Sequence, residues 1–98
     1  MTTRENILSA LSSRKSELSK FGIRKLGLFG SYIRNEQNSN SDIDVLVDFE
    51  PEAESFDNFM AVCDIIEQLF KDEKLEIVTM NGLSPYIGPI ILKEVHYV

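Results

Sequence analysis

The first twenty residues carry apolar side chains at the spacing of a helix. These positions are Ile7, Leu8, Leu11 and Leu18. Such spacing places the side chains on one face, so the pattern predicts a helix over residues 3–21. Thr2 and Glu5 have the spacing of a capping box at its start, and Gly22 is a typical helix stop.

Two later stretches show the same periodicity. In residues 55–71 the apolar positions are Phe56, Phe59, Met60, Cys63, Ile66 and Phe70. These intervals of three and four predict an amphipathic helix. Ser84-Pro85 has the pattern of an N-cap and a first-turn proline, but Gly88-Pro89 would weaken a helix there, so the regular part of a last helix is expected to begin near Pro89. Its expected apolar face consists of Ile87, Ile90, Ile91 and Val95.

Three shorter segments have the pattern of strands. Residues 24–29 are largely apolar and end at Gly30-Ser31, which predicts a strand, a turn and then a short helical turn from Ser31. Residues 42–49 alternate in polarity, and residues 74–80 form a third candidate strand. Helices and strands therefore alternate along the chain. We expect a mixed α/β (α+β) fold in which helices cover a small sheet.

Composition limits what such a fold could do. The 98 residues are enough for one domain, which we expect to span residues 1–98. A net charge of −6 argues against direct binding of nucleic acid, which requires basic surface. The apolar runs are too short to span a membrane and the N-terminus does not resemble a signal peptide, so we expect a cytoplasmic protein without membrane association. The single cysteine, Cys63, offers no zinc site, so any metal would be held by carboxylates.

The second strand contains a pair of such carboxylates. Asp42 and Asp44 lie two residues apart, so both project from one face with their Cα atoms about 6.6 Å apart. Ile43 and Val45 point to the opposite face and anchor the strand in the core. Two carboxylates at this spacing can hold Mg²⁺, although an exposed strand can also carry acids for solubility alone. The later acids from Asp48 onward are expected to be solvated.

Two other features add to this candidate site. Gly30-Ser31 ends a strand in a turn whose N–H groups could bind phosphate, although an ordinary turn would also favour this dipeptide. Arg34 follows near the positive end of the expected helical turn, so it requires an anionic partner, either a triphosphate or Asp42 or Asp44, unless it is simply solvated. Glu76 would share a face with the aspartates if the second and third strands are neighbours.

Three segments carry a resemblance to a known family. They are Leu28-Phe29-Gly30-Ser31-Tyr32-Ile33-Arg34, Ser41-Asp42-Ile43-Asp44-Val45-Leu46-Val47 and Leu75-Glu76-Ile77-Val78-Thr79. In this order they resemble the minimal nucleotidyltransferases of the DNA polymerase β-like superfamily. The resemblance implies the fold of that superfamily and contacts from Gly30 and Ser31 to the nucleotide phosphates. It also implies that Asp42, Asp44 and Glu76 bind two Mg²⁺ ions for transfer from ATP.

The same resemblance implies a partner. Short members of the family resemble antitoxins that transfer AMP from ATP to a tyrosine of a HEPN-type ribonuclease toxin, so a hetero-oligomer is expected. Two residues depart from the family pattern: Glu76 replaces the usual aspartate, and Asn35 replaces a frequent glycine. Glu76 favours an alternative, a silent antitoxin that neutralises its partner by binding. A further alternative is nucleotidyl transfer to a small molecule.

Overall fold

The computed structural model describes residues 2–98. Its helices are α1 (Arg4–Ser13), α2 (Lys15–Ser19), α3 (Phe56–Leu69) and α4 (Gly88–Glu94), with short 3-10 helices η1 (Pro51–Ala53) and η2 (Met80–Gly82). Its strands are β1 (Ile23–Phe29), β2 (Ile43–Phe49), β3 (Leu75–Thr79) and β4 (His96–Tyr97). Within these residues, no helix combines the length and apolar composition needed to cross a membrane.

The four strands form one mixed sheet in the order β3-β2-β1-β4. Strand β1 is antiparallel to both β2 and β4, whereas β2 and β3 run parallel. A parallel pair needs a crossover connection, and α3 provides it. The predicted mixed α/β fold is therefore confirmed, and the three predicted strands are present. The two-residue strand β4 was not predicted.

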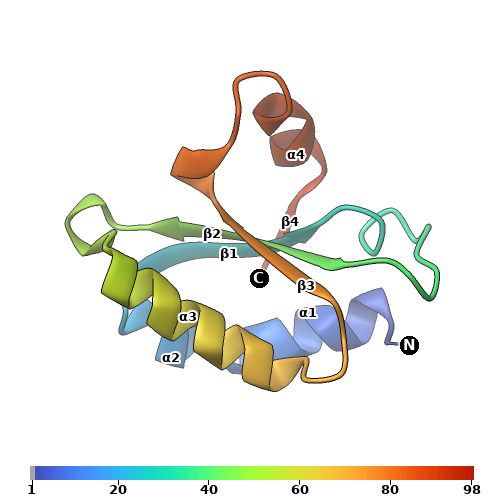
Figure 1. Cartoon of the computed structure of the whole chain (residues 1–98), viewed down its shortest axis with the longest axis horizontal. Helices are drawn as coiled ribbons and strands as arrows, with labels where there is room; N and C mark the ends of the chain where they lie inside the picture. Colours follow the sequence, from blue (N-terminus) through green and yellow to red (C-terminus); the bar gives the residue numbers. More distant parts are fainter. Residues whose placement is uncertain (1) are drawn as a thin grey trace.

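The two faces of the sheet are covered unequally. Helices α1, α2 and α3 lie together on one face (Figure 1), over a core to which every second residue of β2 contributes. Within residues 2–98, the other face carries the short segments η2 and α4, with a smaller apolar cluster. The members of this cluster include Phe29, Leu46, Ile91 and Val95. Because Asp44 alternates with the core residues of β2, its carboxylate lies on this sparsely covered face.

The first predicted helix was wrong in two details. It is divided at Arg14, whose φ of −107° and ψ of 4° separate α1 from α2. Its N-cap is Thr3 rather than Thr2, because Thr3 has extended backbone angles and its hydroxyl accepts a hydrogen bond from the Asn6 N–H. Helix α2 ends at Ser19, three residues before the predicted stop at Gly22, which has a φ of 90°. The side chain of Ser55 likewise caps α3, close to the predicted start.

The predicted apolar face of α4 is only half correct. Ile91 is buried and Val95 packs beside it, but Ile87 and Ile90 are 53% and 62% exposed. The helix has seven residues, so only one side of it reaches the sheet. Helical spacing alone could not show how little of the periodic stretch would be covered.

Candidate active site

Three carboxylates converge where β2 and β3 run side by side. Parallel pairing places Asp44 directly opposite Glu76, and Asp42 precedes β2 by one residue on the same side. One oxygen from each of the three side chains lies within 4.8 Å of the other two. The structure therefore brings together the three acids that the sequence indicated as metal ligands.

The electrostatics of this cluster favour a cation. Burial, followed by the neighbouring Glu76 and Asp42 carboxylates, raises the pKa of Asp44 from 3.8 to about 7. Three acids held this close repel one another when ionised, and a divalent ion removes that cost. An all-carboxylate donor set suits Mg²⁺, which prefers oxygen ligands. The glutamate at position 76 also reaches the cluster despite its extra methylene group.

The turn after β1 lies directly against this cluster. Gly30 has a φ of 81°, and a Cβ atom added to it would overlap the carboxylate of Asp44. Glycine is thus required both by the backbone conformation and by the close approach. The Arg34 N–H donates to the Gly30 carbonyl (3.2 Å) and the Glu36 N–H to the Ser31 carbonyl (2.9 Å). The Arg34 bond has the i to i+4 spacing of one helical turn, so the predicted helical turn is present but does not continue as a regular helix.

Asn35 closes this turn. Its φ is 61°, and among non-glycine residues in the described chain 2–98 it is the one with a positive φ. Asparagine enters this left-handed region more readily than most residues. Asparagine at position 35 is therefore compatible with this turn.

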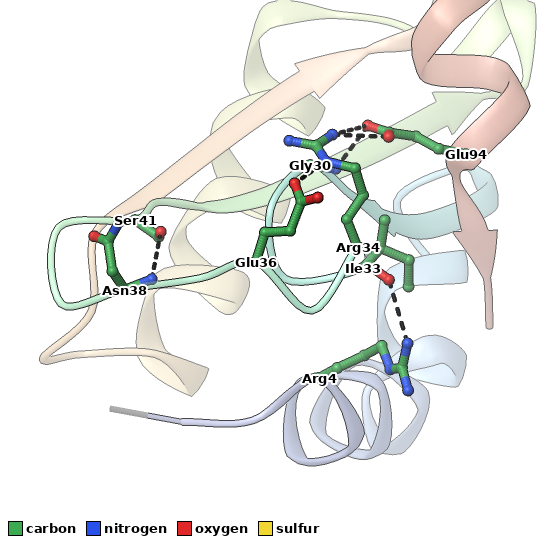
Figure 2. A network of polar contacts seen from close by, with 8 residues as sticks. All are labelled: Arg4, Gly30, Ile33, Arg34, Glu36, Asn38, Ser41 and Glu94. Carbon is green, nitrogen blue, oxygen red and sulfur yellow. Dashed lines mark hydrogen bonds and ion pairs between the residues drawn. The ribbon is translucent and has the colours of Figure 1, made fainter.

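Arg34 has acidic partners other than those expected. Its Nε donates to Glu36 (2.9 Å) and its Nη1 to both oxygens of Glu94 (3.0 and 2.8 Å), as Figure 2 shows. Asp42 and Asp44, one of the alternatives that the sequence left open, do not pair with Arg34, although it is close enough to lower the pKa of Asp44. Glu94 also accepts a hydrogen bond from the Gly30 N–H (3.0 Å).

Glu94 was missed at the sequence level. Its only signal was the requirement that Arg34 have an anionic partner, and the chain has sixteen acidic residues to choose from. Asp48 also differed from expectation. It is 3% exposed and pairs with Arg24 at 2.8 Å, so it is a buried structural acid rather than a solvated one.

The combination of these features defines a class of protein. A glycine turn and an arginine that could bind phosphate lie beside carboxylates that could bind a divalent ion, and this combination is typical of enzymes that transfer nucleotidyl groups. Comparison with known proteins agrees: residues 6–98 match the model of the nucleotidyltransferase domain family. The chain belongs to this family and is a nucleotidyltransferase.

Relatives cover the chain from end to end. Protein adenylyltransferase MntA of Thermococcus cleftensis is 40% identical over 99 residues, which span 100% of this chain and 98% of the relative. A candidate protein adenylyltransferase of Methanocaldococcus jannaschii, MJ0126, is 32% identical over 105 residues and 100% of both chains.

Solved structures show the same fold. A candidate minimal nucleotidyltransferase superposes with a TM-score of 0.81 at 25% identity, over 97% of this chain and 95% of that one. A toxin-antitoxin crystal structure with AMP-PNP superposes with a TM-score of 0.63 at 20% identity, over 98% of this chain and 72% of that one. The second likeness concerns the fold alone.

Proposed function

We propose that this chain transfers AMP from ATP to a tyrosine hydroxyl of a HEPN-type toxin and thereby acts as its antitoxin. The observation that carries the proposal is the convergence of Asp42, Asp44 and Glu76 beside the Gly30 turn. The full-length similarity to a protein named adenylyltransferase MntA supports AMP transfer to a protein. Toxin and antitoxin would then form a hetero-oligomer.

Different residues of the chain would bind the metal ions and the nucleotide. Asp42, Asp44 and Glu76 would hold two Mg²⁺ ions, which when bound lower the pKa of an attacking hydroxyl and neutralise the departing pyrophosphate. Gly30, which has no side chain, would let the triphosphate approach the turn closely, and Ser31 would bind it through its backbone N–H and hydroxyl. Arg34 would add a positive charge beside these donors.

The exposure of the site favours a large acceptor. Asp42 and Glu76 are exposed, and within residues 2–98 the face that carries them is covered by the short segments η2 and α4. A small acceptor needs walls to hold it, whereas a protein acceptor brings its own surface. A hollow of about 480 Å³ between the start of α1 and the end of α3 contains none of the three carboxylates. The open surface therefore supports transfer to a protein.

Co-expression with the candidate toxin tests the proposal. We expect mass spectrometry to find AMP on a toxin tyrosine with the wild-type chain and none with the double variant Asp42→Asn, Asp44→Asn. Asp72→Asn, an exposed acid after α3, is the matched control and should leave the modification intact. An unmodified toxin bound tightly by the wild-type chain would refute AMP transfer and support the silent antitoxin instead.

A further inference from the structure

Glu94, at the end of α4, makes contacts that join the C-terminal helix to the phosphate turn. One of its oxygens accepts hydrogen bonds from both the Gly30 N–H and Arg34 Nη1, each at 3.0 Å. The other accepts from Arg34 Nη1 at 2.8 Å. Figure 2 shows Glu94 reaching the turn from the helix above it. The Glu94 carboxylate thus accepts hydrogen bonds from the Gly30 N–H and Arg34 Nη1, both near the place where phosphate is expected.

The remaining donors of the turn show that Glu94 leaves room for the nucleotide. Arg34 uses Nε for Glu36 and Nη1 for Glu94. Among residues 2–98, neither Arg34 Nη2 nor the Ser31 hydroxyl makes a hydrogen bond. These free groups can bind phosphate while the contacts of Glu94 remain in place. The geometry is that of a support for the turn rather than of a competitor for phosphate.

The chain segment that follows Glu94 is packed and hydrogen-bonded against β1. Val95 follows Glu94 and packs against Gly27, where a Cβ atom would come within 2.7 Å of the valine Cγ2. Strand β4 then pairs with β1, and the Val98 N–H donates to the Leu26 carbonyl at 2.9 Å. Glu94 is therefore held by β1, the same strand that leads into Gly30. Its carboxylate is delivered at a fixed place relative to the turn.

The nearby acidic cluster explains why Arg34 needs to be held in place by Glu94 and Glu36. Arg34 is close enough to the acidic cluster to influence Asp44, and an unrestrained guanidinium would be attracted toward those acids. There it would compete with a divalent cation for the same oxygens. Glu94 and Glu36 hold two of the guanidinium nitrogens away from such a contact.

We propose that Glu94 is a positioning residue for nucleotide binding: it fixes the Gly30 N–H and Arg34 so that Ser31 and Arg34 Nη2 face the phosphates. The inference rests on the proposed function, because it assumes that this turn receives ATP with Mg²⁺. It makes α4 a part of the nucleotide site and predicts that Glu94 acts through Arg34.

Calorimetric titration of the purified chain with ATP and Mg²⁺ tests this role without any acceptor. We expect Glu94→Gln to weaken binding about tenfold, the size of losing one charge-supported contact, while Glu94→Asp falls in between. Glu67→Gln, an exposed change of the same chemistry on α3, should bind like the wild type. In an Arg34→Gln background, Glu94→Gln should add almost no further loss, because the effect passes through the arginine.

The outcomes separate this inference from the proposed function. Thermal unfolding must first show that each variant is folded; if Glu94→Gln is not, Glu94→Asp provides the comparison. Unchanged or tighter ATP binding by Glu94→Gln would overturn the positioning role, since tighter binding means that the carboxylate competes with phosphate. A wild-type chain that binds ATP but leaves the toxin unmodified would refute the proposed function alone. A wild-type chain that binds no ATP would overturn both.

Discussion

Asp44→Asn should stabilise the metal-free protein at high pH, although it removes a residue of the site. The folded chain gives Asp44 a pKa of about 7, against an ordinary value of 3.8. Between these pH values the folded state retains a proton that the unfolded state has lost. The contribution of Asp44 to the free energy of unfolding therefore falls as the pH rises from about 4 to about 7, and its full cost is present above that range.

The size of this effect follows from the burial of the carboxyl group. The gap of about 3 between the two pKa values corresponds to at most about 4 kcal/mol. Because Asp44 is only half-buried, solvent screening reduces the expected cost to about 1–2 kcal/mol. Asparagine has nearly the same shape and carries no charge. The Asp44→Asn variant should therefore have a free energy of unfolding about 1–2 kcal/mol higher than the wild type at pH 8, and a much smaller difference at pH 4.5.

Urea unfolding with EDTA at the two pH values measures the difference. Added Mg²⁺ at pH 8 should then stabilise the wild type more than the variant, because binding to the folded state alone adds stability. Asp48→Asn is the matched control on the same strand: it removes the ion pair between the buried Asp48 carboxylate and the partly exposed Arg24, and should cost about 1–3 kcal/mol. An Asp44→Asn variant that is no more stable than the wild type at pH 8 in EDTA would refute the reasoning.

Three other substitutions test the site and its turn. Glu76→Gln should weaken Mg²⁺ binding at least about tenfold in a metal titration, because it removes one of three charges around the ion; equal affinity would remove Glu76 from the ligand set. Gly30→Ala should lower the free energy of unfolding by at least about 1–2 kcal/mol, measured with urea, because a positive φ and a clash with Asp44 both oppose it. Asn35→Ala should cost about 1 kcal/mol in the same assay while Asn35→Gly costs little, and equal losses would contradict a left-handed requirement there.

Periodicity explains why much of this site could be predicted. Asp42 and Asp44 share a face because strands alternate, and that rule needs no knowledge of the rest of the fold. The position of Glu76 required one assumption, that β2 and β3 are neighbours, and the pairing of Asp44 with Glu76 bears it out. Local patterns with a fixed period therefore identified the acidic cluster.

The parts that could not be predicted depend on distant contacts. Glu94 and Arg34 are 60 residues apart, and nothing in their local sequences singles out this pair. Strand β4 has only two residues, too few to show an alternating pattern. Asp48 looked like the first of several solvated acids, but its burial depends on Arg24 in β1. Each of these features is set by how β1 is packed against later segments.

The parallel register of β2 and β3 has a consequence for folding. Asp44 lies opposite Glu76 only in the observed alignment, and a slip of one residue would turn Glu76 to the face that carries α3. A misaligned sheet would therefore lack a complete set of ligands, so an ion that binds all three acids stabilises only the correct alignment. A divalent cation present during refolding should thus suppress strand-slipped species and increase the yield of the native sheet.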